Sequence, residues 1–390
     1  MNTKKIAELY DRYAIPVYNR LGIAAARASG SWVWDQEGKR YLDLFPGWGT
    51  NALGHCHPAV VKAVQTQVKK LIHVPNTFYN EPQARLAEGL IKSSFPGKAF
   101  FSSTGAESVE AAIKLVRKFG AGSRYEIITT VGSFHGRTMG ALAATGQPKY
   151  NRDFQPMLAG FQHVPFNRLE AVETAIRPET AAVMIELVQG EGGIHVASKE
   201  YVQGLRRLCD EKNLLLIFDE ISTGMGRTGT LYCYQQYGVQ PDILLLAKPA
   251  AGGLPIGILI ADLEISDLWE KASHATTFGG NPLVCAAGLA TLQVAKKASV
   301  VANVRKQSSY LFQELRKLQK RHPTIREIRG LGLMLGIELD RPGAPIVKEA
   351  LKRGLLLNCT QEKILRLYPA MTVSRKEIDQ GLKILNECLK

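Results

Sequence analysis

The 390-residue sequence lacks the features that mark several classes of protein. It has no run of about 18 apolar residues that could form a transmembrane helix, and residues 1–8 contain no apolar signal-peptide core. Its six cysteines are widely spaced and never form Cys-x-x-Cys, which favours reduced thiols. From these absences we expect a cytoplasmic protein with no membrane partner.

The sequence also lacks a complete set of metal ligands. His55, Cys56 and His57 are consecutive, but glycine and proline flank them and no second cluster completes a tetrahedral site. We therefore interpret this triplet as a turn and expect no metal. The net charge is +14, yet the lysines and arginines are scattered and no aromatic-interleaved basic patch is present. The charge therefore favours attraction of small anions over nucleic-acid binding.

The composition is that of a soluble globular protein, with 45% hydrophobic and 22% charged residues. A chain of this length can bury a large core and divide into one large and one smaller domain. We expect an N-terminal segment (1–50), a large domain (51–290) and a small C-terminal domain (291–390). The N-terminal segment reads as a helix followed by strands at 31–35 and 40–44, and we expect it to pack with the small domain.

The large domain alternates short apolar strands with helical patterns. Predicted strands lie at 126–129, 182–185, 214–218, 243–246 and 256–260. Continuous apolar strands that alternate with helices predict an α/β fold, with a mostly parallel central sheet covered on both faces. A long helical stretch from 283 to about 318 and a turn plus strand at 329–339 follow; with the mixed helices and short strands of the closing region, they indicate a smaller α+β domain.

Two of these strands deliver opposite charges to their carboxyl ends. The strand at 214–218 is followed by Asp219 and Glu220, and the strand at 243–246 is followed closely by Lys248. A buried ammonium is costly, so such a lysine should be paired, neutral or covalently used. Because ligands of parallel sheets bind at this edge, we predict a site where a cationic heterocycle meets a carbonyl-reactive lysine. Pyridoxal phosphate has this chemistry.

A turn at 102–107 opens a helix whose apolar face carries Val109, Ala112, Ile113 and Val116. The free N–H groups of such a turn can hold a phosphate. Simple helix capping is the commoner role of Ser and Thr at this position, so the turn gains weight only from the neighbouring motifs.

Other candidate groups stand at strand exits and in turns. Phe134 could stack on a planar ring and Arg137 could fork onto a carboxylate, although a core phenylalanine and a surface arginine would give the same pattern. Thr276 and Thr277 add hydroxyl donors in a tight turn. Arg366 lies inside an apolar run, where an arginine needs an anionic partner, and Glu191 is one candidate for that partner.

Taken together, these sequence features resemble those of the class III, acetylornithine/ornithine-type aminotransferases, which belong to the fold-type I pyridoxal-phosphate enzymes. The similarity covers nearly the whole chain. Its cofactor motifs are Thr104-Gly105-Ala106-Glu107, Phe134-His135-Gly136-Arg137-Thr138, Ile217-Phe218-Asp219-Glu220, Thr223-Gly224-Met225-Gly226-Arg227-Thr228-Gly229, Ala247-Lys248 and Thr277-Phe278-Gly279-Gly280-Asn281-Pro282. Two softer stretches, 72–83 and 144–147, are similar to the acetylornithine branch of that family.

The resemblance implies a role for each candidate residue. Lys248 is expected to bind pyridoxal 5'-phosphate covalently and to move the proton during catalysis, and Asp219 to pair with the ring nitrogen. The implied cofactor-binding set is Gly105, Ala106, Phe134, Asp219, Glu220, Ile221, Ser222, Lys248 and Thr277, with Phe134 and Ile221 on the two ring faces. Thr277 is expected from a second subunit, which implies a homodimer. The implied substrate-binding set is Arg137, Glu191, Thr276 and Arg366, with Glu191 as a gate for the arginines.

The implied reaction is transfer of the terminal amine of N-acetylornithine to 2-oxoglutarate, giving N-acetylglutamate 5-semialdehyde and glutamate, a step of arginine biosynthesis. A related enzyme acting on ornithine, succinylornithine or succinyldiaminopimelate, or an aminomutase, is the alternative within the fold. A degenerate homologue without catalysis is a second alternative. A nucleotide hydrolase is set aside, because no Gly-x-x-x-x-Gly-Lys-Ser/Thr loop occurs.

Four positions depart from the family pattern. Ser222 replaces a glutamine that contacts the cofactor's phenolic oxygen, at an expected cost of about 1–3 kcal/mol in binding. Pro249 follows the lysine where a small residue is usual, and should favour an extended Lys248. Ala251 replaces a glycine and Leu187 replaces a proline. Reduced turnover or altered substrate choice is therefore part of the expectation, and the degenerate homologue draws its support from Ser222 and Pro249.

Overall fold

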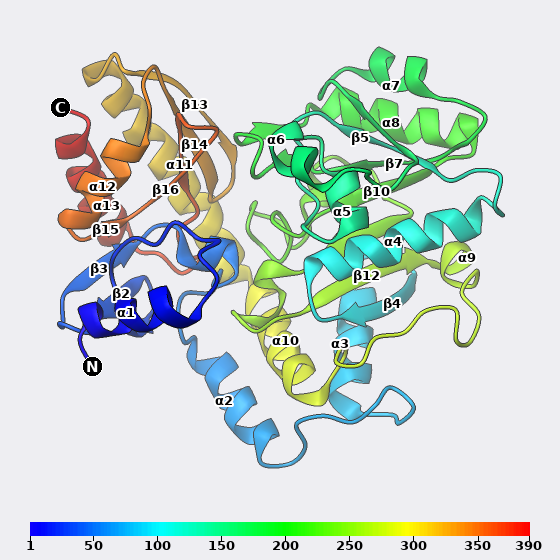
Figure 1. Ribbon diagram of the computed structural model, residues 1–390, viewed down its shortest axis with the longest axis horizontal. Helices are drawn as coiled ribbons and strands as arrows, with labels where there is room; N and C mark the ends of the chain where they lie inside the picture. The colour runs from blue at the N-terminus through cyan, green and yellow to red at the C-terminus, as the bar shows by residue number, and fades with distance from the viewer.

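The computed structural model describes all 390 residues. A larger lobe surrounds a central sheet, and a smaller lobe beside it holds both chain ends (Figure 1). The larger lobe comprises α2 (Pro58–Val68), α3 (Glu81–Ile91), β4 (Gly97–Ser102), α4 (Gly105–Phe119), β5 (Glu126–Thr130), α5 (Met139–Ala144), α6 (Pro148–Asn151), η2 (Arg152–Phe154), β6 (Phe161–Val164), α7 (Leu169–Ala175), β7 (Thr180–Ile185), β8 (Val188–Gln189), β9 (His195–Val196), α8 (Lys199–Lys212), β10 (Leu215–Asp219), η3 (Cys233–Gln236), β11 (Ile243–Leu246), η4 (Lys248–Ala251), β12 (Gly257–Asp262), α9 (Leu263–Ser266) and α10 (Pro282–Ala295).

The smaller lobe combines the two ends of the chain. It comprises α1 (Thr3–Tyr13), β1 (Ala25–Ser29), β2 (Trp32–Asp35), β3 (Arg40–Asp43), η1 (Pro46–Gly49), α11 (Ala298–Arg321), β13 (Ile325–Leu331), β14 (Met334–Leu339), α12 (Ala344–Lys352), β15 (Leu355–Leu356), β16 (Asn358–Thr360), β17 (Ile364–Leu367) and α13 (Arg375–Cys388). The N-terminal strands form one sheet with β15, in the order β1-β2-β3-β15, so the first fifty residues are tied to the C-terminal region by main-chain pairing. The exact domain limits stay a prediction.

The central sheet has the strand order β4-β12-β11-β10-β7-β5-β6. Only β12 runs antiparallel to its neighbours, which confirms the predicted mostly parallel sheet. All five predicted strands are present with small shifts at their ends. β4 and β6, which were not predicted, complete the two edges.

Both faces of this sheet are buried, which explains the unbroken apolar character of its strands. In β10, Leu216 and Phe218 join the core that contains the inner side of α8, whereas Leu215 and Ile217 join the core that contains α4. The predicted apolar face of α4 is buried along its whole length. Period-two alternation of polar residues is absent because neither face meets water.

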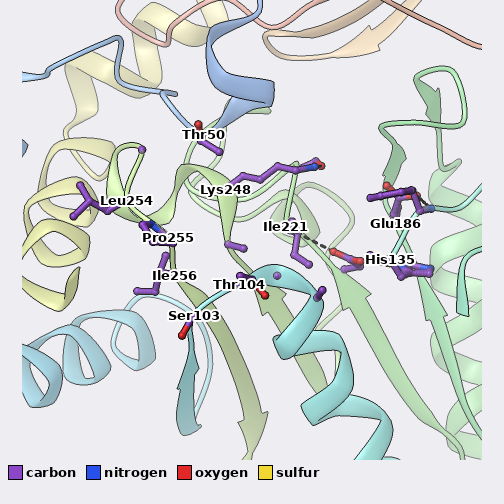
Figure 2. Close-up of a pocket in the computed structure, with 18 residues that line it drawn as sticks. Thr50, Ser103, Thr104, His135, Glu186, Ile221, Lys248, Leu254, Pro255 and Ile256 are labelled. Atoms are coloured by element: carbon purple, nitrogen blue, oxygen red, sulfur yellow. Dashed lines mark hydrogen bonds and ion pairs between the residues drawn. The ribbon is translucent and has the colours of Figure 1, made fainter. Parts of the chain in front are cut away.

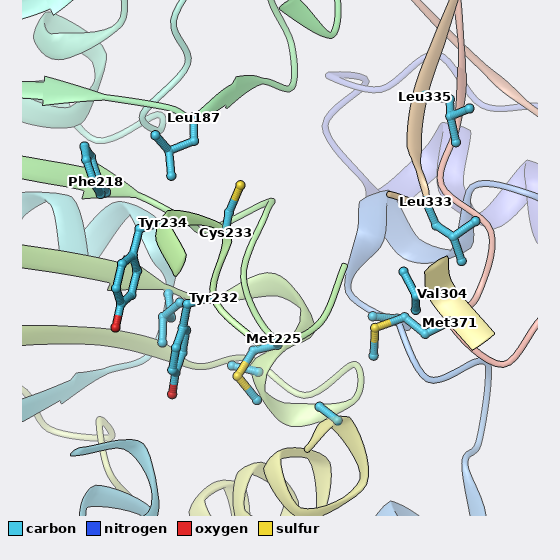
Figure 3. Packing of buried hydrophobic residues seen from close by; sticks show 14 of the residues in the cluster. Leu187, Phe218, Met225, Tyr232, Cys233, Tyr234, Val304, Leu333, Leu335 and Met371 are labelled. Carbon is cyan, nitrogen blue, oxygen red and sulfur yellow. The ribbon is translucent and has the colours of Figure 1, made fainter. Parts of the chain in front are cut away.

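One hydrophobic core joins the two lobes. Figure 3 shows Phe218 and Tyr234 on the larger-lobe side of this cluster and Val304, Leu333 and Met371 on the smaller-lobe side. The contact between the lobes is therefore apolar and extensive at its centre, which fixes the polar groups at its rim relative to one another.

Two sequence expectations in the C-terminal part hold only in outline. The stretch from 283 to 318 is helical, as predicted, but it is divided: α10 and α11 meet at an angle of 66°, because Lys297 has an extended backbone (φ −63°, ψ 128°). The segment 329–339 is not a turn plus one strand but part of a hairpin, with Arg329 inside β13 paired antiparallel to β14. No single helix is long and apolar enough to cross a membrane; only α10 and α11 taken together reach that length and composition.

Candidate functional site

A cavity of about 360 Å³ opens at the carboxyl ends of the parallel strands, next to the smaller lobe. Figure 2 shows Lys248 extending across this cavity in the direction of Glu186 and His135, with Ser103 and Thr104 at the start of α4. The edge of the sheet predicted from the sequence is therefore the edge that carries the cavity.

Lys248 lies on the cavity wall, two residues after the end of β11. Its Nζ donates a hydrogen bond of 2.6 Å to Ser222 Oγ. Burial lowers the pKa of Lys248, and the charges of Glu191, Glu186 and Asp219 oppose that shift. A lysine with a lowered pKa has a larger share of neutral amine, which is the nucleophilic form.

The expected extended conformation of Lys248 was wrong. Lys248–Ala251 forms a short 3-10 helix, with Pro249 in its first turn, where a missing N–H costs no helical bond. Gly252 takes the left-handed conformation that ends the turn (φ +61°), so Ala251 needs no glycine-like backbone and is buried in the core. Leu187 is likewise fully buried, in the core of Figure 3.

Asp219 is the last residue of β10 and is only 3% exposed. Its Oδ2 accepts a hydrogen bond of 2.7 Å from His135 Nδ1, and its Oδ1 accepts one from the backbone N–H of Ile221 at 3.0 Å. Burial opposes the charged form of His135, but the hydrogen bond and charge of Asp219, aided by Glu186, raise its pKa. His135 therefore supports a negative charge on Asp219 and orients it towards the cavity.

Glu186 is a buried carboxyl group on the same wall, directly after β7. It accepts hydrogen bonds from the backbone N–H groups of Phe134 (3.0 Å) and Gly190 (3.1 Å), and burial raises its pKa to about 7. The sequence reasoning assigned no role to Glu186 or His135. Glu186 carried a usable signal, because an acidic residue directly after an apolar strand was the pattern that identified Asp219.

The start of α4 forms the opposite end of the cavity. Thr104 caps the helix through a capping box with Glu107, and Gly105 and Ala106 line the cavity with the helix N-terminus. A Cβ on Gly105 would lie 2.9 Å from Ile221 Cδ1 and 3.1 Å from Ala247 Cβ, so glycine lets the helix begin this close to the wall without displacing either side chain. Free N–H groups at a positive helix end suit a phosphate.

Phe134 and Ile221 line the cavity between these two ends. Together with Lys248, Asp219 and the α4 terminus, they supply an amine, a carboxylate, apolar walls and an anion site. These groups fit pyridoxal phosphate, whose aldehyde, ring nitrogen, flat ring and phosphate need those four environments.

Arg366 and Glu191 pair beside this cavity, as hypothesised from the sequence. Arg366 Nη1 lies 2.7 Å from Glu191 Oε1, and Arg366 is 2% exposed in β17. Arg366 Nε donates to Asn358 Oδ1 at 2.7 Å, and its guanidinium lies over the Phe45 ring at 4.8 Å. A buried arginine held by other hydrogen bonds, with a more exposed glutamate partner, can exchange that partner for a substrate carboxylate.

Besides Glu191 and Arg366, which lie beside the cavity, four of the predicted residues do not line its wall in this chain. Arg137 is exposed and its guanidinium lies 4.0 Å from the Tyr150 ring centroid. Glu220 points away and accepts from the N–H groups of Cys233 and Tyr234, both at 2.7 Å. Thr276 and Thr277 also do not line the cavity.

The chain belongs to the class III aminotransferases: the model of that family, "Aminotransferase class-III", matches residues 13–389. Enzymes of this class use pyridoxal phosphate, so the fit described above is that of the class cofactor.

Within this family, the chain is similar to acetylornithine and ornithine aminotransferases. The acetylornithine aminotransferase of Caldanaerobacter subterraneus subsp. tengcongensis is 49% identical, over 97% of each chain. The structure of N-acetylornithine aminotransferase from Stenotrophomonas maltophilia K279a is 35% identical with a TM-score of 0.84, over 98% of this chain and 97% of that one. The ornithine aminotransferase from Toxoplasma gondii ME49 has a TM-score of 0.96 at 28% identity, over 100% and 95% of the two chains.

Proposed function

We propose that this chain transaminates N-acetylornithine with 2-oxoglutarate, giving N-acetylglutamate 5-semialdehyde and glutamate in arginine biosynthesis. The observation that carries the proposal is the joint presence of Lys248 and the His135–Asp219 pair on the cavity wall and of the Arg366–Glu191 pair beside it, close enough for both charges to act on Lys248. The acetylornithine aminotransferases that are similar over nearly the full length support the choice of donor.

The cavity residues divide the chemical work between them. When bound, pyridoxal phosphate supplies an aldehyde that condenses with amines and a ring that withdraws electrons. Lys248 would hold it and then move a proton to or from the substrate carbon that carries the amine. Asp219 would stabilise a proton on the ring nitrogen, with His135 fixing the carboxylate. Gly105 and Ala106 would donate backbone N–H groups to the phosphate, and Phe134 and Ile221 would hold the ring between them.

Two arginines, Arg137 and Arg366, would select the substrates by their carboxylates. Arg137 would bind the single carboxylate of N-acetylornithine, which lies at the end of the molecule opposite the transferred amine. Arg366 would bind the second carboxylate of 2-oxoglutarate. With the donor bound, Glu191 keeps Arg366 neutralised; with 2-oxoglutarate bound, Glu191 releases it. The 2.7 Å pair in the structure corresponds to the neutralised arrangement.

A cytoplasmic homodimer with a shared active site is part of this proposal. Thr276 and Thr277 lie outside the cavity of their own chain. Their segment is tied to the loop at 72–79, because Asn76 Nδ2 donates to Thr276 O (3.2 Å) and His73 packs against Phe278. Apolar side chains are exposed on this loop, including Phe78 (61%) and Tyr79 (106%). A second copy covering this surface would bury them and bring Thr277 to its own phosphate site.

An ornithine aminotransferase is the second candidate, because the Toxoplasma gondii structure matches the fold with a TM-score of 0.96. The experiment that separates the candidates is a panel of amine donors mixed with the purified, cofactor-loaded protein. N-acetylornithine is expected to bleach the visible absorption of the bound cofactor fastest, and 2-oxoglutarate to restore it.

The matched control is Lys248→Ala. It is expected to lack the lysine-bound absorption and to lose at least about 10⁴-fold in turnover, since the amine serves as both nucleophile and proton carrier. Faster turnover of ornithine than of N-acetylornithine would reject the proposed donor. A wild-type protein that is colourless after incubation with excess pyridoxal phosphate and removal of the unbound cofactor would refute catalysis altogether.

A further inference from the structure

The backbone of the loop that carries Glu191 is held by side chains of the smaller lobe. The carbonyl oxygen of Glu191 accepts two hydrogen bonds, from Gln361 Nε2 at 2.7 Å and from Thr360 Oγ1 at 2.9 Å. Both donors lie at the end of the β16–β17 hairpin, whose second strand carries Arg366. The same hairpin therefore carries Arg366 and holds the backbone of Glu191, the residue that pairs with it.

The flanking carbonyl groups of this loop are held in the same way. Arg366 Nη1 donates to Gly190 O at 2.9 Å, and Arg329 Nε donates to Gly193 O at 2.8 Å. Because these donors come from β17 and β13, the loop follows the smaller lobe, although the strands on either side of it belong to the larger lobe. The Glu191 carboxylate is held only by Arg366 and by a 3.4 Å hydrogen bond from Thr360 Oγ1, so it is the part of the loop that can change partners.

Gln361 uses its whole amide group in this contact. Besides Glu191 O, its Nε2 donates to Gln147 Oε1 at 2.9 Å, and its Oε1 accepts from Lys149 Nζ at 3.3 Å. Gln147 Nε2 in turn donates to Ser133 O at 3.1 Å, one residue before Phe134. Two amide side chains thus connect the cofactor wall of the larger lobe with the Glu191 loop.

The backbone at Gln361 is strained to make these bonds. Gln361 and Glu362 are consecutive residues with positive φ, +47° and +61°, a conformation that residues other than glycine rarely adopt. Such outliers persist when the surroundings over-determine them and concentrate at functional sites. The Glu362 side chain is exposed and makes no hydrogen bond, whereas the Gln361 side chain makes three. The functional part of the strained turn is therefore Gln361.

We infer that Gln361 is a positioning residue that holds Glu191 against Arg366 and so sets the discrimination between N-acetylornithine and glutamate as amine donors. The inference rests on the gate role of Glu191 in the proposed function. With Glu191 fixed, the closed pair neutralises Arg366 and penalises glutamate, which carries a second carboxylate. Loosening the Glu191 backbone weakens that pair and makes Arg366 available to glutamate.

The test measures kcat/KM for both donors in the amine-donating half-reaction, followed by the absorption of the bound cofactor. In Gln361→Gly the ratio of N-acetylornithine to glutamate is expected to fall about five- to tenfold, the effect of losing one hydrogen bond. The thermal midpoint is expected to change little, because glycine accepts the positive φ while the three side-chain hydrogen bonds of Gln361 are lost. A merely structural role would lower the midpoint and leave the ratio in place.

Glu362→Gly is the matched control. It relieves backbone strain one residue further along and removes no side-chain hydrogen bond, so the midpoint should stay or rise while the donor ratio stays that of the wild type. A changed ratio in Glu362→Gly would assign the effect to turn flexibility and overturn the inference.

A double-mutant cycle with Glu191→Ala separates the two levels of the proposal. Glu191→Ala alone should shift the ratio towards glutamate by more than Gln361→Gly does, and adding Gln361→Gly should then change nothing. An equal effect of Gln361→Gly in both backgrounds would show that it does not act through Glu191. An unchanged ratio in Glu191→Ala would refute the gate in the proposed function, whereas a shifted ratio there with an unchanged ratio in Gln361→Gly would refute the inference alone.

Discussion

The two ends of the active-site region are built differently. At the inner end, Lys248, Asp219 and Glu186 stand at or just beyond the carboxyl ends of β11, β10 and β7, which are neighbours in one sheet. At the outer end, Arg366 comes from a strand of the smaller lobe and Glu191 from a loop between the lobes. The inner end is positioned by main-chain pairing within a sheet, and the outer end by side-chain contacts between lobes.

This difference matches what each end must do. The inner end serves the same cofactor in both half-reactions, so its side chains can keep fixed positions and be shielded from water. In the proposed function, the outer end accepts one substrate with one carboxylate and another with two, so its charges need to change partners. Rigid strand ends suit the first task, and a tethered loop with a free carboxylate suits the second.

The largest expected effect comes from breaking the inner end. Asp219→Asn should lower kcat about 100-fold, because a charged hydrogen bond of roughly 3 kcal/mol to the ring nitrogen is lost. Steady-state kinetics with saturating donor and 2-oxoglutarate measures it. The adjacent Glu220→Gln is the control, since that carboxyl group points away from the cavity. Similar losses in both variants would contradict the separate role of Asp219.

A smaller effect is expected at the outer end. Arg366→Gln should raise the KM for 2-oxoglutarate about tenfold, the loss of one charged hydrogen bond in a partly open site. The KM for N-acetylornithine should change less than threefold, since that donor does not depend on Arg366. A parallel rise of both KM values would show that Arg366 holds the lobes together and does not select the substrate.

The smallest effect concerns stability and pH. Burial raises the pKa of Glu220 from 4.5 to about 8. Between these values the folded chain keeps a proton that the unfolded chain has lost, so this group's stabilising contribution is present below pH 4.5 and falls as the pH rises to about 8. Glu220→Gln should flatten the fall in unfolding free energy by about 1.4 kcal/mol per pH unit, measured by denaturant unfolding.

The exposed Glu211→Gln should leave that slope unchanged. An identical slope in wild type and Glu220→Gln would mean that Glu220 is ionised in the folded protein, held by the N–H groups of Cys233 and Tyr234.

The sequence by itself determined the inner end of the site. Apolar strands buried on both faces leave a recognisable local pattern, and a charged residue directly after such a strand marks the edge where ligands bind. Asp219 and Lys248 were identified in this way, and the turn before α4 was identified from its Ser/Thr-Gly residues ahead of an amphipathic helix. The same pattern applied to Glu186, and its omission was a failure to use a signal that was present.

Only the tertiary structure decided the contacts between distant segments. His135 and Asp219 are 84 residues apart, and Glu191 and Arg366 are 175 apart. Sequence patterns report local periodicity, so Glu191 could be proposed as a partner for Arg366 but the distance between them could not. The break between α10 and α11 and the strained turn at Gln361 likewise depend on neighbours from other elements. Such features arise because packing between lobes overrides local preference, and no window of the sequence contains that information.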